Sequence, residues 1–197
     1  MKSGLARLIG LVVSAYTVAA CSAPDAVGPT ATGVGPIGTV SDEIVNPAVL
    51  ATALRRTKTL SRDYTASITL SSSGGSLKIP EAGLNVNIPR GAITKTTTIT
   101  VTALKGDLVA YEFQPHGIRF AVPLKLTQDL TYTTWAGNTG NTALEAGYFA
   151  NTSQIDWASG SVWINEFLPV SVSATGNRLH WEVHHFSGYM ISSGRKQ

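Results

Sequence analysis

Apolar and polar side chains alternate strictly along several short segments of this chain. Between residues 64 and 71, Tyr, Ala, Ile and Leu occupy the even positions, and Thr and Ser occupy the odd ones. A period of two places all the apolar side chains on one face of an extended strand, so this segment predicts a half-buried β-strand. The same alternation recurs at 77–79, 84–88, 99–103, 109–113, 124–126, 162–164, 170–172 and 179–183.

Turn-forming residues separate these alternating segments. Gly74-Gly75, Lys105-Gly106-Asp107 and Thr175-Gly176-Asn177 each lie between two of them. Short strands with turns at this spacing predict an all-β antiparallel fold, a sandwich or a barrel, of which we favour the β-sandwich. We place this single domain at residues 63–192, with a short tail at 193–197. A domain of about 130 residues buries enough surface to fold without disulfides.

The first 21 residues have the three parts of a secretion signal. Lys2 and Arg7 form a positive start, residues 8–20 are apolar, and small residues precede Cys21. The apolar stretch is shorter than the about 20 residues that a spanning helix needs, so we expect cleavage. Val18-Ala19-Ala20-Cys21 resembles the bacterial lipobox, which implies a signal peptide at 1–20 and a lipid anchor on the Cys21 thiol. Ser22 then favours the outer membrane of the cell envelope, on a side that the sequence does not specify.

Two further segments separate the anchor from the domain. Residues 21–46 are rich in Pro and Gly without periodicity, which predicts a flexible linker. Asn46-Pro47 can cap and open a short helix with Val49, Leu50 and Leu54 on one side. We therefore expect residues 47–62 to form a short helix or a continuation of the linker, at the edge of the domain.

Charge and cysteine content exclude several classes of protein. The chain carries 15 Lys and Arg against 12 Asp and Glu, and removal of Lys2 and Arg7 with the signal lowers the net charge from +3 to +1. The densest basic runs are the pairs Arg55-Arg56 and Arg195-Lys196, so we expect no nucleic-acid partner. A single Cys excludes an intramolecular disulfide and a Cys-rich zinc site.

A set of turn and core residues resembles a known family. Gly74-Gly75, Ile88-Pro89-Arg90-Gly91-Ala92, Pro115-His116-Gly117, Phe120 and Pro123-Leu124-Lys125-Leu126 occur in the order and spacing of the ZU-five domain. This β-sandwich is shared by ankyrins, netrin receptors and zonula-occludens proteins, and the similarity extends to His185-Phe186-Ser187-Gly188-Tyr189. The resemblance implies a lone bacterial interaction module; the partners of eukaryotic relatives do not carry over. Pro89, Gly91, Pro115 and Gly117 also have a structural reading, as turn residues.

The resemblance also implies one candidate chemistry. Some relatives cleave themselves between Phe and Ser of such a motif, which would make Ser187 the nucleophile, His185 the base and Phe186 the acyl donor. The alternation places His185 on the core face, and Phe186 breaks it, which predicts a corner or bulge. The alternative, which we favour, is that His185 locks a turn while Phe186 fills the core.

Other residue types with possible chemistry are few. His180 and His184 share the outward face of one strand, but two His do not make a structural zinc site, so we expect no metal and no cofactor. Neither a GxSxG elbow nor an HExxH motif is present, and we expect no enzyme beyond the self-cleavage alternative.

Two tryptophans lie in predicted loops. Trp135 belongs to a loop rich in Gly and Asn, and Trp157 follows Asp156 in another. Exposed loop Trp side chains stack on sugars or anchor protein partners, whereas buried ones cap the ends of a sandwich. These two residues are the candidate binding residues, and capping of the sandwich is the alternative that we favour for them.

Three functions remain, and we rank them. The first is a membrane-anchored lipoprotein that presents a non-catalytic sandwich to an envelope or extracellular partner. The second is a self-processing domain cleaved between Phe186 and Ser187. The third is an envelope carbohydrate-binding module that uses Trp135 and Trp157.

Overall fold

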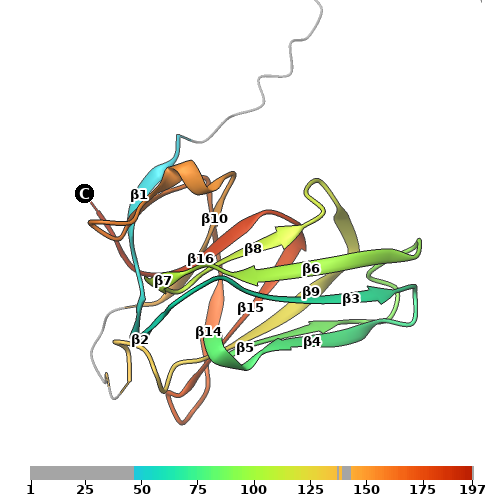
Figure 1. The fold of residues 1–197 in the computed structure, drawn as a ribbon, viewed down its shortest axis with the longest axis horizontal. Coiled ribbons are helices and arrows are strands. Elements are labelled where there is room, and N and C mark those ends of the chain that lie inside the picture. The colour runs from blue at the N-terminus through green and yellow to red at the C-terminus, as the bar shows by residue number, and fades with distance from the viewer. Residues whose placement is uncertain (1–46, 137, 139–142, 197) are drawn as a thin grey trace, which may run out of the picture. The chain divides into compact units, whose positions relative to one another are not determined.

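The computed structural model describes residues 47–136, 138 and 143–196, which form an all-β structure (Figure 1). Two short 3-10 helices, η1 (Pro80–Ala82) and η2 (Thr152–Gln154), interrupt the strands. The predicted signal peptide, Cys21 and the linker at 21–46 lie outside the described residues. The strands are β1 (Val49–Ala53), β2 (Arg55–Leu60), β3 (Tyr64–Leu70), β4 (Gly75–Ile79), β5 (Leu84–Ile88), β6 (Thr97–Ala103), β7 (Gly106–Leu108), β8 (Ala110–Gln114), β9 (Arg119–Asp129), β10 (Glu145–Phe149), β11 (Ile155–Asp156), β12 (Ser161–Ile164), β13 (Glu166–Leu168), β14 (Val170–Val172), β15 (Arg178–His185) and β16 (Gly188–Arg195).

Two antiparallel sheets face each other across the main core. The smaller sheet has the order β14-β15-β9-β5-β4, and the larger follows β11-β12-β1-β16-β8-β6-β3, with β10 paired to β16 and β13. Strands β2 and β7 form a separate pair. The predicted all-β antiparallel β-sandwich is therefore confirmed.

The main core lies between the sheets and follows the predicted alternation. On β15, Leu179, Trp181 and Val183 are buried and the residues between them are exposed. The larger sheet contributes Tyr111 and Phe113 from β8 to the same cluster. Burial of large side chains from both sheets supplies the driving force for the fold.

A second, smaller core lies on the opposite face of the larger sheet. Its buried side chains come from strands at one end of the molecule and include Ala51, Phe149, Val162, Ile164 and Met190. Strand β16 passes between the two cores, because Tyr189 and Ile191 belong to the main one and Met190 to the second. This strand is therefore buried on both faces.

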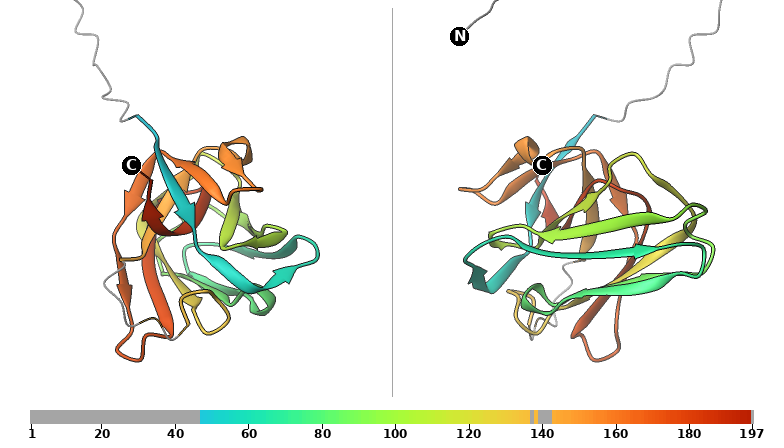
Figure 2. Two further views of the ribbon diagram at one scale, coloured as in Figure 1. Left: turned by 90° about the vertical axis from the view of Figure 1, so that its left-hand side faces the viewer. Right: turned by 45° about the vertical axis from the view of Figure 1, so that its right-hand side comes forward.

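Both edges of the sandwich are bridged by chain connections. The edge strands β3 and β4 belong to different sheets and are joined by a turn at residues 71–74, and they lie side by side (Figures 1 and 2). At the other edge, Pro169 alone separates β13 of the larger sheet from β14 of the smaller. Such bridges shield strand edges from pairing with other chains.

The glycines expected at turns have the backbone conformation that the turns require. Gly91 and Gly117 both have φ of 82°. An L side chain rarely adopts this left-handed conformation, so the interpretation of Gly91 and Gly117 as turn residues is confirmed.

The helix expected at the start of the domain is wrong. Residues 49–53 and 55–60 are strands, and β1 pairs with β12 on one side and β16 on the other. An isolated helix of this length is marginal, so pairing with two strands outweighs the local cap at Asn46-Pro47. The domain therefore begins well before residue 63, and β16 extends it into the predicted tail as far as Arg195.

Candidate functional site

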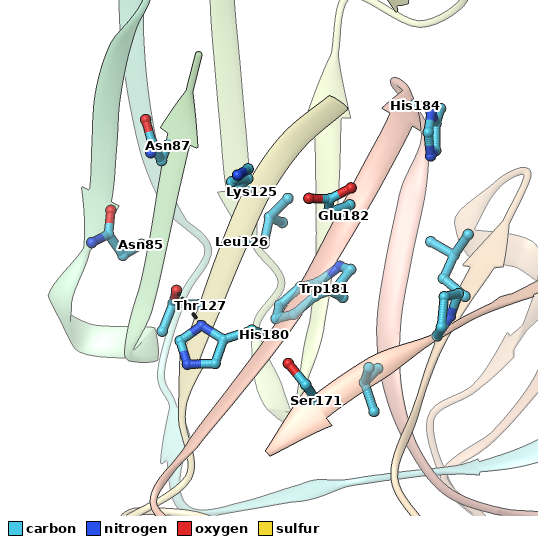
Figure 3. Close-up of a pocket in the computed structure, with 13 residues that line it drawn as sticks. Asn85, Asn87, Lys125, Leu126, Thr127, Ser171, His180, Trp181, Glu182 and His184 are labelled. Carbon is cyan, nitrogen blue, oxygen red and sulfur yellow. Dashed lines mark hydrogen bonds between the residues drawn. The ribbon is translucent and has the colours of Figure 1, made fainter. Parts of the chain in front are cut away.

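The outer face of the smaller sheet carries a groove of about 640 Å³. Its floor comes from β5, β9 and β15, and residues 168–171 form one side (Figure 3). Because the apolar residues of these strands point into the core, the alternating polar ones point into the groove. The polar residues are Asn85, Asn87, Lys125, Thr127, Ser171, His180, Glu182 and His184.

Strand register arranges these side chains in two rows across the sheet. In the first row, Asn85 lies opposite Thr127, Thr127 opposite His180, and His180 opposite Ser171. Thr127 Oγ1 and His180 Nδ1 are 3.0 Å apart and share a hydrogen bond (Figure 3). This row offers an amide, an imidazole and hydroxyls to a ligand.

The second row adds charge to the groove. Asn87 lies opposite Lys125, and Lys125 lies opposite Glu182. All three side chains are exposed. An ammonium and a carboxylate on neighbouring strands give the groove both a cationic and an anionic contact beside an amide.

Apolar residues complete the side and floor of the groove. Leu168, Pro169 and Val170 form the side, and Trp181 contributes from β15. The Trp181 ring belongs to the main core, and its Nε1 is buried with no hydrogen-bond partner among the described residues. The groove therefore joins a polar floor to an apolar side, and polar groups that converge beside an apolar surface are a feature of binding sites.

The three residues predicted for self-cleavage meet at a second cleft, of about 580 Å³. Gly117, Arg119, Tyr148 and Glu166 line it together with His185, Phe186 and Ser187. The register of β15 on β9 shifts between Val183 and His185, so the predicted bulge is confirmed. Phe186 is buried against Phe113 and Phe120, with ring centroids 5.8 and 4.7 Å away.

The imidazole of His185 is engaged with residues other than Ser187. Its Nδ1 lies 3.2 Å from the Tyr189 hydroxyl and its Nε2 3.7 Å from Glu166 Oε2. The same hydroxyl donates to the His185 carbonyl oxygen at 2.7 Å. Burial raises the pKa of Tyr189, and the neighbouring Glu166 and Tyr148 raise it further, so this donor keeps its proton. These contacts lock the corner.

The peptide groups on either side of the Phe186–Ser187 bond are hydrogen-bonded. The Phe186 N–H donates to the Ile118 carbonyl oxygen at 2.9 Å, and the Ser187 carbonyl accepts from Phe113 N–H at 3.0 Å. Among the described residues, no hydrogen bond joins His185 to Ser187. The geometry favours the turn-locking interpretation over self-cleavage.

The two candidate tryptophans differ in exposure. Trp135 is buried, in agreement with the capping alternative and not with a role as an exposed binding residue, because its side chain is 8% exposed and belongs to the main core. The loop folds inward after Thr133, whose Oγ1 accepts the Trp135 N–H at 3.2 Å. Trp157 is 43% exposed and lines a cleft with Asp63, Lys105 and Glu112. Only Trp157 of this pair presents a ring to solvent.

The turn that carries Trp157 is fixed by a carboxylate. Asp156 accepts hydrogen bonds from the hydroxyl of Ser159 and from the backbone N–H groups of Ser159 and Ala158. These bonds hold the pKa of Asp156 below its ordinary value. The exposed ring therefore stands on an ordered turn.

Comparison with known proteins adds no relative. No family model matches the chain, and no curated protein matches it. Within the part of the chain that the structure describes, no helix is long and apolar enough to cross a membrane.

Sequence reasoning did not single out the groove. The polar positions of each strand were visible, but the register that aligns Asn87, Lys125 and Glu182 was not. A signal was present in the alternation itself, because the outward positions of β5 and β15 are amide, charged or imidazole residues, whereas those of β3 are Thr and Ser. Cys21, the predicted lipid attachment site, lies outside the described residues.

Proposed function

We propose that this protein is an envelope lipoprotein that presents a non-catalytic β-sandwich interaction domain on a tether from the membrane. The groove on the outer face of the smaller sheet carries the proposal. It aligns amide, ammonium, carboxylate and imidazole groups in register and needs no reacting group among them. The sandwich architecture supports the further proposal that the domain is ZU-five-like, although a fold does not determine function.

The anchor is tested by removing its attachment point. Cys21→Ala should abolish incorporation of labelled fatty acid and move the protein from the membrane fraction to the soluble fraction. Ser22→Ala is the matched control and should leave both unchanged. Membrane retention of unlabelled Cys21→Ala would contradict the lipoprotein proposal, and the proposal that the groove binds a partner would be unaffected.

A polysaccharide is the second candidate partner, and the exposed ring of Trp157 favours it. Rings stack on sugars, and the amide and carboxylate groups of the groove hydrogen-bond to hydroxyls. Cosedimentation with peptidoglycan sacculi tests this candidate in the full chain. Glu182→Ala and Trp157→Ala report on the groove and the loop, and Thr98→Ala, on an exposed position of the larger sheet, is the control.

Each variant has a distinct outcome. Loss of cosedimentation with Glu182→Ala alone would assign the polysaccharide to the groove, and loss with Trp157→Ala alone would assign it to the loop. Equal loss in all variants would indicate damage to the fold. No cosedimentation of the wild-type chain would exclude peptidoglycan and leave an envelope protein as the partner to be sought.

A further inference from the structure

The exposed ring of Trp157 lines a cleft of about 540 Å³, which we name the Trp157 cleft. Four separate parts of the chain complete it: the turn before β3, the turn between β6 and β7, strand β8 and helix η2. The other lining residues are Asp63, Leu104, Lys105, Gly106, Glu112 and Thr152. Small-molecule sites commonly have volumes of about 300–1,000 Å³, so the cleft is large enough for a ligand or for one part of a polymer.

The Trp157 ring is held in place and left open to solvent. The hydrogen bonds that Asp156 accepts order the turn on which the ring stands. A Cβ built on Gly106 would lie 3.8 Å from Trp157 Cζ3, so a side chain at this position would contact the ring. The glycine therefore leaves this part of the ring free. A ring that is already fixed loses little conformational entropy when a ligand stacks on it.

Two carboxylates accompany the ring in the Trp157 cleft. Asp63 is exposed, and its Oδ1 accepts the backbone N–H of Lys105 at 2.7 Å. Glu112 is half-buried on β8, and its Oε1 lies 3.4 Å from Nε2 of His116, which does not line the cleft. Lys105 is the one cation among the lining residues, and its side chain is exposed. Acidic groups therefore outnumber basic ones beside the ring.

Hydroxyl groups continue the polar surface beyond Glu112. In the register of the larger sheet, Thr65 lies opposite Thr102, and Thr102 lies opposite Glu112. The hydroxyls of Thr65 and Thr102 are 3.0 Å apart and share a hydrogen bond. Their neighbours Val101 and Ala103 belong to the main core, so this row points away from it, as Glu112 does. A ligand that extends from the cleft along this row meets hydroxyl groups.

We propose that the Trp157 cleft binds an amino-sugar unit with a free, protonated amine. This inference rests on the polysaccharide candidate above and names the class of sugar. The apolar face of the sugar ring stacks on Trp157, and the ammonium group is attracted by Asp63, by Glu112 and by the indole ring. An N-acetylated sugar retains the stacking but lacks the charge. An acidic sugar brings a third carboxylate beside two others and is disfavoured.

Calorimetric titration of the purified full chain with three sugars tests the proposal. The probes are oligosaccharides of equal length built from glucosamine, from N-acetylglucosamine and from galacturonic acid. We expect saturable binding of the glucosamine oligosaccharide, at least about tenfold tighter than that of the N-acetylglucosamine oligosaccharide, because only the first offers an ammonium group. The galacturonic acid oligosaccharide should not bind. All titrations use the same ionic strength, so that screening is equal for the three probes.

Variants of the lining residues separate stacking from charge recognition. Trp157→Ala should weaken glucosamine binding at least about tenfold, and Trp157→Phe should restore part of it. Glu112→Gln and Asp63→Asn keep the side-chain size, and each should reduce the preference for glucosamine about fivefold. Lys105→Gln removes the competing cation and should strengthen binding about twofold. Glu182→Gln, which removes a carboxylate from the groove on the smaller sheet, is the matched control and should leave binding unchanged.

The outcomes distinguish the amino-sugar site from the polysaccharide candidate. Absence of glucosamine binding, or equal binding of the acetylated oligosaccharide, would overturn the amino-sugar proposal. Equal binding that is lost in Trp157→Ala would still support the polysaccharide candidate. A loss with Glu182→Gln as large as that with Glu112→Gln would place the sugar outside the cleft and refute the site. If Trp157→Ala does not fold, Glu112→Gln decides, and an unchanged preference there refutes the proposal. Glucosamine binding without cosedimentation with sacculi would support the site and exclude peptidoglycan.

Discussion

At the scale of single residues, two glycines allow the strands of the second core to approach closely. A Cβ on Gly188 would lie 2.0 Å from Phe149 Cε2, and one on Gly147 would lie 2.8 Å from Ile164 Cδ1. We expect Gly188→Ala to lower the free energy of unfolding by about 3 kcal/mol, the upper end of the usual cost of overpacking a core. Denaturant unfolding measures it, with Gly194→Ala in the same strand as control. A Cβ there meets nothing within 4 Å, and an equal loss in both variants would contradict the packing argument.

The solvent exposure of individual side chains was the property that the sequence predicted least well. Trp135 and Trp157 both follow polar loop residues, and the sequence does not distinguish them. The difference arises from the Thr133 turn, which directs Trp135 into the core, and from the Asp156 turn, which leaves Trp157 outside. Arg56 is a similar case, because a pair of arginines in sequence gives no sign that one is buried.

At the scale of elements, β1 decides between the expected helix and the observed strand. In a helix with Val49, Leu50 and Leu54 facing the domain, Ala51 would point away from it; in β1, Ala51 is fully buried and Val49 is exposed. We expect Ala51→Asp to lower the free energy of unfolding by more than about 3 kcal/mol, because a carboxylate without a partner is placed in the second core. Val49→Asp should change it by less than about 1 kcal/mol. Denaturant unfolding of both variants provides the test, and the reverse order would favour a helix.

The strands that the sequence predicted are those with one face in water. Alternation revealed β3, β5, β6 and β15, whose outward residues are polar. Strand β16 has a core on each face, so Tyr189, Met190 and Ile191 form a continuous apolar run without the period of two. Strand β16 therefore escaped prediction, whereas β12, which also contributes to the second core, was predicted from its alternation at 162–164.

At the scale of the whole molecule, strand register forms a binding groove from side chains that no single segment contains. The groove joins β5 and β9 to the β14–β15 hairpin, and these three parts are distant in sequence. The predicted lipid anchor and linker at residues 21–46 would determine where in the cell the domain is held, and they do not contribute to the groove. Fold class could be predicted from local periodicity, whereas the groove depended on pairing between distant strands.

We also predict that the polypeptide chain is not cleaved between Phe186 and Ser187. We expect one uncut mass when the purified protein is denatured and weighed, identical in wild type and Ser187→Ala apart from the one oxygen atom removed. The reason is that His185 is held by Tyr189 and Glu166, while the peptide groups flanking the Phe186–Ser187 bond are hydrogen-bonded to β8 and to residue 118. Self-cleavage needs a base at the Ser187 hydroxyl. Two wild-type fragments that together exceed the intact mass by one water, split before Ser187 and absent from the variant, would instead make the corner a reactive site.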